Sequence, residues 1–200
     1  MSLSKIVITG TIASGKSTLC KLLEEMGYKV ISADEVNRAL LEPGSKNFEA
    51  IKNSGEFDEV FNNESLDKKA LAQIIFSDSY KLKKLNQLTH RNILDEIENQ
   101  IAKLDESVVF IEIPLFFQME EKFVANEVWL VVANYETQLK RLIKRDNIDR
   151  SYAKLKIESQ DQLLNMKEKS DVVFDNSTSI ENLRNELENV LKQKDLLWKF

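Results

Sequence analysis

A short loop near the start of the chain carries the residue types that bind the phosphates of a nucleoside triphosphate. It runs from Gly10 to Thr18, and its first eight residues, Gly10–Ser17, match the pattern G-x-x-x-x-G-K-[ST]. Glycines let such a loop fold tightly, so that several backbone N–H groups point at one anion, and the lysine reaches the β and γ phosphates. The serine hydroxyl is placed to ligate Mg²⁺. The predicted ATP-binding residues here are Gly10, Ala13, Ser14, Gly15, Lys16, Ser17 and Thr18.

A carboxylate follows the next apolar run. The predicted strand 28–31 leads into Ser32-Ala33-Asp34, at the sheet edge that also holds the loop. Asp34 can accept a hydroxyl proton as a phosphoryl group is transferred. It can equally be the N-cap of a helix predicted over 35–41, because Asp is favoured at that position. The residues alone leave both interpretations open.

A basic stripe is predicted on a later helix, over 135–145. Gln138, Arg141 and Arg145 share one side of it, opposite leucine and isoleucine residues. Fixed guanidinium groups suit the oxygens of a phosphoryl group in transfer, whereas the alternative is a solvated basic face. Glu112 ends the strand predicted over 108–113, where an acidic residue can hold Mg²⁺ or its water, or can simply be a polar strand end.

The remaining pattern predicts the elements that position these residues. Five short runs are almost continuously apolar, as expected of parallel strands that are covered on both faces: 5–8, 28–31, 108–113, 127–132 and 171–174. Amphipathic helices lie between them, the first with Leu19, Leu22, Leu23 and Met26 at helical spacing. Cys20 on this helix is expected to pack rather than react. About 75 residues between the second and third strands show no strand signal and predict a helical insertion.

The bulk properties narrow the function. The formal net charge of the 200 residues is −5, which argues against a general nucleic-acid-binding surface. No apolar run approaches the length that spans a membrane, and one cysteine allows no intrachain disulfide, so we expect a cytoplasmic protein. No N-K-x-D guanine signature is present, which disfavours a GTPase switch. A small-molecule kinase fits these features better.

The chain also resembles the dephospho-CoA kinase family along nearly its whole length. The resemblance rests on the order and spacing of short motifs. They are Gly10–Thr18, Ser32-Ala33-Asp34, Leu41-Glu42-Pro43-Gly44, Thr89-His90, Ile113-Pro114-Leu115, Glu136–Arg141 with Arg145, Ile157-Glu158-Ser159-Gln160 and Asp175-Asn176. The chain departs from the family's usual residues at Ser32, Arg91, Glu112 and Gln118.

The resemblance implies a P-loop kinase α/β fold with a parallel five-stranded sheet, a helical substrate-binding insertion and a lid. The core is expected at about 1–34, 105–135 and 168–200, the insertion at about 35–104 and the lid at about 136–167. It implies transfer of the ATP γ-phosphoryl group to the 3′-hydroxyl of dephospho-CoA, with Mg²⁺ as cofactor.

The resemblance also implies roles for single residues. The catalytic residues are expected to be Asp34, Lys16, Arg141 and Arg145, and Asn176 joins Arg141 in binding ATP. The lone histidine, His90, lies on the apolar side of its helix and by itself reads as a core residue. The resemblance places His90 and Arg91 with Asp34 at the acceptor, and Ser17 with Glu112 at the metal. The alternatives are another P-loop kinase, of the nucleotide or shikimate type, and a regulatory protein that binds ATP without turnover.

Overall fold

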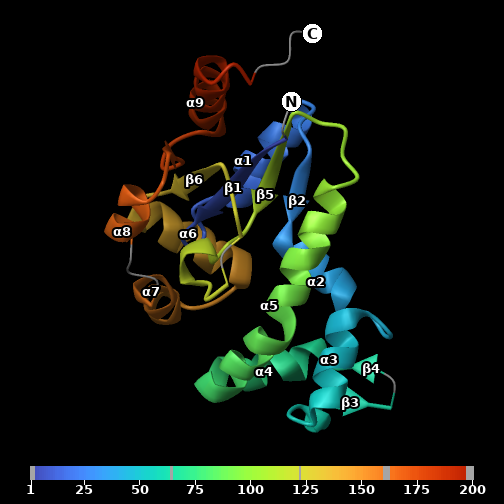
Figure 1. Cartoon of the computed structure of the whole chain (residues 1–200). Coiled ribbons are helices and arrows are strands. Elements are labelled where there is room, and N and C mark those ends of the chain that lie inside the picture. The colour runs from blue at the N-terminus through green and yellow to red at the C-terminus, as the bar shows by residue number, and fades with distance from the viewer. Residues whose placement is uncertain (1–2, 64, 122, 160–162, 197–200) are drawn as a thin grey trace. The chain divides into compact units, whose positions relative to one another are not determined.

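The structure, a computed structural model, describes residues 3–63, 65–121, 123–159 and 163–196. It divides into two compact units, shown in Figure 1. The first unit contains the chain up to Ile31 and from Glu106 onward, and the second contains Ser32–Asp105. Each has its own hydrophobic core. Gln160, in one of the motifs behind the family resemblance, lies outside the described residues.

The first unit is built on a five-stranded sheet with the strand order β2-β5-β1-β6-β7. Strand β1 pairs in parallel with β5 and β6, and β6 pairs in parallel with β7. This sheet confirms the predicted α/β class. The strands are β1 Ser4–Gly10, β2 Val30–Ser32, β5 Val108–Glu112, β6 Glu127–Val132 and β7 Val172–Asp175.

An aromatic and aliphatic core joins this sheet to its helices. Trp129 lies between Phe110 and Phe174, with ring centroids 5.1 and 5.4 Å apart, and all three are fully buried. Leucines from α1 and α9 complete the same cluster, because their apolar stripes face the sheet. The helices of this unit are α1 Lys16–Glu25, η2 Phe116–Gln118, α6 Tyr135–Asp146, α7 Arg150–Glu158, α8 Leu163–Glu168 and α9 Ile180–Gln193.

The second unit is mainly helical, as the apolar pattern predicts for this segment. The prediction that it lacks strands is wrong, because Phe61–Asn62 and Ser65–Leu66 form a small antiparallel pair, β3 with β4. Each of these strands has only two residues, too few to show an alternating pattern. The elements are α2 Ala33–Leu40, α3 Lys46–Ser54, η1 Asp58–Val60, β3 Phe61–Asn62, β4 Ser65–Leu66, α4 Lys68–Ser77 and α5 Ser79–Ile101.

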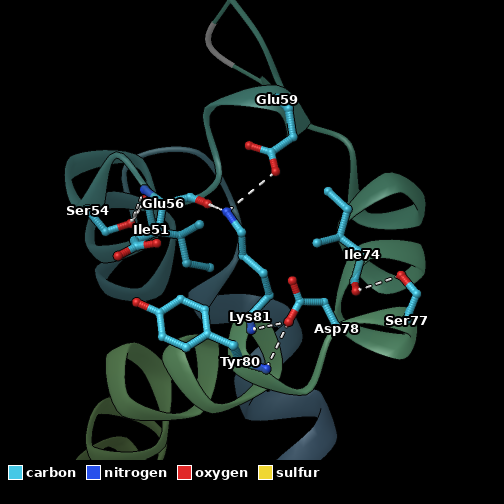
Figure 2. A network of polar contacts seen from close by, with 9 residues as sticks. All are labelled: Ile51, Ser54, Glu56, Glu59, Ile74, Ser77, Asp78, Tyr80 and Lys81. Atoms are coloured by element: carbon cyan, nitrogen blue, oxygen red, sulfur yellow. Dashed lines mark hydrogen bonds and ion pairs between the residues drawn. The ribbon is translucent and has the colours of Figure 1, made fainter.

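A polar network fixes the corner between α4 and α5 (Figure 2). Asp78 caps α5, since its Oδ1 accepts hydrogen bonds from the backbone N–H groups of Tyr80 and Lys81 at 2.9 and 3.1 Å. The Lys81 ammonium group donates to the carbonyl of Glu56 and lies 3.6 Å from the carboxylate of Glu59. It also lies 5.0 Å from the ring centroid of Phe57. These contacts hold the start of α5 against the segment that follows α3.

Among the described residues, no helix has both the length and the apolar character needed to cross a membrane.

Candidate active site

The predicted phosphate-binding loop lies between β1 and α1, at a helix start that has no side-chain cap. The N-cap of α1 is Gly15, whereas α6, α7 and α9 are each capped by a side-chain oxygen. The first backbone N–H groups of a helix have no partner within the helix. Without a capping side chain, the N-terminus of α1 can offer these N–H groups and its positive dipole end to an anion.

The two glycines of the motif, Gly10 and Gly15, stand at positions where neighbouring atoms leave no room for a side chain. A Cβ atom at Gly10 would lie 2.2 Å from the carbonyl oxygen of Val131 on β6. A Cβ atom at Gly15 would lie 1.9 Å from Nδ2 of Asn176, and Gly15 also has a φ of +99°. The loop can therefore press against the ends of β6 and β7 only if these two positions lack a side chain.

We expect Gly15→Ala to lower the free energy of unfolding by about 3 kcal/mol, because it adds steric overlap to backbone strain. Gly27→Ala is the matched control, since Gly27 has a φ of +86° and a Cβ atom there would meet nothing within 4 Å. Strain alone predicts a loss of about 1 kcal/mol at Gly27. Urea unfolding of both variants measures the difference. Equal losses would show that Asn176 does not constrain the loop.

Lys16 folds back over the loop that contains it. Its Nζ donates hydrogen bonds to the carbonyl oxygens of Gly10 and Thr11, at 2.9 and 3.1 Å. The ammonium group thus lies over the loop, where the motif predicts the β and γ phosphates. Phosphate oxygens are charged acceptors and bind an ammonium group more strongly than carbonyls do. The position of Lys16 fits its predicted role in holding the triphosphate.

Ser17, at the start of α1, and Glu112, at the end of β5, are in contact. The Ser17 hydroxyl donates a hydrogen bond to Oε1 of Glu112 at 3.3 Å, although the two residues lie far apart in the sequence. Hydroxyl and carboxylate oxygens are suitable ligands for Mg²⁺, which usually keeps several waters and also binds substrate phosphates. No group of three or more His, Cys, Asp or Glu residues is arranged to hold a metal within the described part of the chain. The residues present therefore fit Mg²⁺ bound together with a nucleotide rather than an all-protein metal cage.

Arg141 on α6 contacts the loop directly. Its Nη1 donates to the carbonyl oxygen of Ser14 at 3.3 Å, and its Nη2 donates to Oδ1 of Asn176 at 3.4 Å. Asn176 is only 1% exposed, and its Nδ2 donates to the same Ser14 carbonyl at 2.9 Å. The alternative of a merely solvated helix face is therefore wrong for Arg141.

Arg145 lies one turn further along α6 and is turned toward Asp146. Its Nε donates to Oδ1 of Asp146 at 2.7 Å, and its side chain is 59% exposed. The hydrogen bond from Arg145 lowers the pKa of the Asp146 carboxyl group and raises the pKa of the guanidinium group. The structure thus brings Arg141 to the loop and leaves Arg145 in an ion pair at the end of the helix.

Cys20 is a packing residue, as predicted. It is buried in the main core of the first unit, and burial raises the pKa of its thiol. A buried, protonated thiol is unreactive.

The structure changes the interpretation of Asp34. The N-cap of α2 is Ser32, whose Oγ accepts a hydrogen bond from the backbone N–H of Glu35 at 3.5 Å. Asp34 is the second residue of the helix and is exposed. The capping alternative for Asp34 is therefore wrong. Its role as a base stays a prediction.

The other predicted acceptor residues lie on α5, also in the second unit. His90 is half-buried, and its neighbour Thr89 is buried with its hydroxyl bonded to the carbonyl of Leu85. Arg91 is 70% exposed and pairs through Nε with Oδ1 of Asp95 at 3.0 Å. Substrate contacts by His90 and Arg91 stay predictions.

Gln138 is the residue of this region that the sequence did not assign to the site. It shares the polar stripe of α6 with Arg141, yet it is only 4% exposed. Its Nε2 donates to the hydroxyl oxygen of Thr11 in the loop at 3.1 Å and to the carbonyl oxygen of Ala133 at 2.8 Å. The signals in the sequence were its place on the stripe and its place within the motif Glu136–Arg141.

The comparisons with known proteins point to the same family. A family model described as "CoaE: Dephospho-CoA kinase" matches residues 4–182. A dephospho-CoA kinase of Carboxydothermus hydrogenoformans is 34% identical, over 98% of this chain and 94% of that protein. A dephospho-CoA kinase of Fusobacterium nucleatum subsp. nucleatum is 35% identical, over 94% of this chain and 97% of that protein.

Solved structures agree with this result. The dephospho-CoA kinase from Campylobacter jejuni has a TM-score of 0.69 and 29% identity, over 95% of this chain and 96% of that one. The protein TT1252 from Thermus thermophilus has a TM-score of 0.82 and 28% identity, over 96% and 98% of the two chains. A shikimate kinase from Acinetobacter baumannii, in complex with shikimate, shares the fold at 14% identity and a TM-score of 0.55, over 98% and 96%.

Proposed function

The chain belongs to the dephospho-CoA kinase family, and from this membership we infer that it transfers the γ-phosphoryl group of ATP to the 3′-hydroxyl of dephospho-CoA. The products are CoA and ADP, and the reaction is the last step of CoA biosynthesis. The observation that carries this inference is the family match over residues 4–182, which covers the phosphate loop and every other predicted site residue.

We propose that the loop and α6 together bind ATP. Backbone N–H groups from Ala13 to Thr18 surround the phosphates, and Lys16 exchanges its contacts with loop carbonyls for contacts with phosphate oxygens. Arg141 and Asn176 hold the Ser14 carbonyl, so they keep this binding surface in shape. A binding site that is rigid before the ligand arrives loses less entropy when the ligand binds.

Ser17 and Glu112 are the residues that would hold Mg²⁺, Glu112 directly or through a water. When bound, Mg²⁺ neutralises the charge that develops on the phosphate oxygens. Their 3.3 Å contact supports this proposal, because two oxygens this close together are within reach of one small ion or its water shell.

For the acceptor, we propose that Asp34 accepts the proton of the 3′-hydroxyl as the phosphoryl group moves to that oxygen. Arg141 and Arg145 stabilise the negative charge on the transferring phosphoryl group and exclude water that would otherwise hydrolyse ATP. His90 and Arg91 contact dephospho-CoA. In this scheme the segment at about 35–104 binds the acceptor, the segment at about 136–167 is the lid, and the rest forms the core.

The test is an ADP-release assay in which dephospho-CoA, shikimate and nucleosides are offered separately with ATP and Mg²⁺. We expect turnover with dephospho-CoA and at most background release with the other acceptors. Turnover with shikimate or a nucleoside instead would move the chain to another kinase class. ATP binding without ADP release under any condition would favour the regulatory alternative.

A further inference from the structure

Gln138 and Thr11 form a buried link between α6 and the phosphate loop. Thr11 is 6% exposed and Gln138 is 4% exposed, so water competes little for their hydrogen bond. The amide nitrogen of Gln138 donates to the Thr11 hydroxyl oxygen at 3.1 Å and to the Ala133 carbonyl at 2.8 Å. Burying an amide is unfavourable unless it is hydrogen-bonded, so these two bonds specify how the Gln138 side chain is placed.

Thr11 also organises the loop through its main chain. Its carbonyl oxygen accepts hydrogen bonds from Nζ of Lys16 at 3.1 Å and from the backbone N–H of Ser14 at 3.3 Å. Thr11 therefore accepts one hydrogen bond from Gln138 through its side chain and another from Lys16 through its backbone carbonyl. A shift of Thr11 would move the acceptor that holds the Lys16 ammonium group over the loop before ATP binds.

The same helix delivers Arg141. Residues three apart on a helix lie on the same face, so fixing Gln138 against Thr11 also fixes where Arg141 meets the loop. Arg141 donates to the carbonyl of Ser14, and the backbone N–H of Ser14 bonds in turn to the Thr11 carbonyl. Gln138 is thus linked to two residues proposed to contact ATP, to Lys16 through Thr11 and to Arg141 through α6.

We propose that Gln138 is a positioning residue for the kinase reaction, which fixes α6 against the phosphate loop and acts on ATP through Thr11, Lys16 and Arg141. The inference rests on the proposed function for the identity of the nucleotide. It adds a residue that fixes the relative position of the phosphate-binding loop and the lid helix.

The test combines Gln138→Leu with Thr11→Val, alone and together. Each change keeps the approximate side-chain volume and removes one partner of the hydrogen bond. We expect each single variant to weaken ATP binding in calorimetry, and to lower kcat/KM for ATP, by about ten-fold. The double variant should lose about as much as either single variant, because the interaction can be lost only once. KM for dephospho-CoA should stay within about two-fold of the wild-type value.

Two further variants separate positioning from general destabilisation. Thr11→Ser keeps the hydroxyl and should restore nearly normal ATP affinity. Gln100→Leu makes the same chemical change on α5, where the amide nitrogen of Gln100 donates to Oε1 of Glu96 at 3.4 Å, and it should leave the affinity for ATP unchanged. All kinetics are measured below the unfolding transition of each variant. A purely structural role would lower the melting temperature and leave the ATP affinity of the folded protein unaltered.

Normal ATP affinity in folded Gln138→Leu would overturn the proposal, as would losses in the double variant that simply add. If Gln138→Leu does not fold, the comparison of Thr11→Val with Thr11→Ser decides, and equal ATP affinity in those two variants would also overturn it. Because calorimetry measures ATP binding without an acceptor, these outcomes do not depend on whether dephospho-CoA is the substrate. Absence of wild-type turnover with dephospho-CoA would instead count against the proposed function alone.

Discussion

Asp34→Asn is expected to slow phosphoryl transfer to dephospho-CoA by at least about 10²-fold, with a nearly unchanged melting temperature. A general base contributes on the order of 10²–10⁴-fold to a rate, and Asn keeps the shape of the side chain while losing the basic carboxylate. Stability should change little, because Asp34 is exposed and Ser32 provides the cap of α2. ATP affinity should stay close to normal. Steady-state kinetics with both substrates, thermal melts and calorimetry measure these quantities.

Two matched variants make this result specific. Glu35→Gln removes an exposed negative charge from the same first turn of α2, and it should leave the transfer rate within about two-fold of wild type. Ser32→Ala removes the actual cap, and it should cost about 1 kcal/mol of stability. Phosphoryl transfer has a loose transition state, so a base can also act by placing the hydroxyl, which raises KM for the acceptor. Full activity with a normal acceptor KM in Asp34→Asn would contradict the role of Asp34.

Arg141→Ala is expected to lower kcat by roughly 10³-fold and to change KM for dephospho-CoA much less. Arginines that stabilise charge on a phosphoryl group in transfer contribute 10³–10⁵-fold, and they act in the transition state more than in the ground state. KM for ATP should rise moderately, since Arg141 also holds the Ser14 carbonyl of the loop. Single-turnover measurements of the transfer step separate the chemical rate from product release.

Two other arginines provide comparisons for this prediction, one as a control and one as a second lid residue. Arg184→Ala removes an arginine on α9 that pairs with Glu25, and it should leave kcat unchanged. Arg145→Ala should also lower kcat, by a smaller factor, because Arg145 must first leave Asp146 before it can approach a phosphoryl group. An unchanged kcat in Arg141→Ala would show that its contact with the loop has no role in catalysis.

The sequence predicted the parts of the fold that depend on local pattern. Apolar runs of strand length between amphipathic helices predicted all five strands of the main sheet, with ends that differ by at most two residues. The second strand, predicted over 28–31, is observed at Val30–Ser32, because the apolar run continues from a turn into the strand. The phosphate loop was predictable because its glycines and lysine stand at fixed spacing.

The sequence left the cap of α2 open for a common reason. Ser and Asp cap helices almost equally well, so the sequence Ser32-Ala33-Asp34 allows a helix to begin after either residue. Helix α9 shows the same ambiguity, because its cap is Ser179 although Thr178, another residue favoured at caps, stands beside it. Neighbouring residues of similar capping strength leave the choice to tertiary packing.

Contacts between residues far apart in the chain were not visible in the sequence. Thr11 and Gln138 are separated by 127 positions, and only the folded sheet brings α6 to the loop. Arg145 differs, because its partner is the next residue in the chain. Its guanidinium group, which we predict to contact the phosphates, bonds to the adjacent carboxylate of Asp146. The sequence identified the residue types of the site, whereas their partners depended on the tertiary structure.

The most direct test of the central claim follows the γ-phosphoryl group itself. The wild-type protein is incubated with Mg²⁺, dephospho-CoA and ATP whose γ-phosphoryl group carries a heavy-oxygen label, and the masses of the separated products are determined by mass spectrometry. We predict one labelled CoA for each ADP formed, with the label removed by a 3′-specific nucleotidase. Label that appears only as inorganic phosphate, or at another position of the acceptor, would contradict the account.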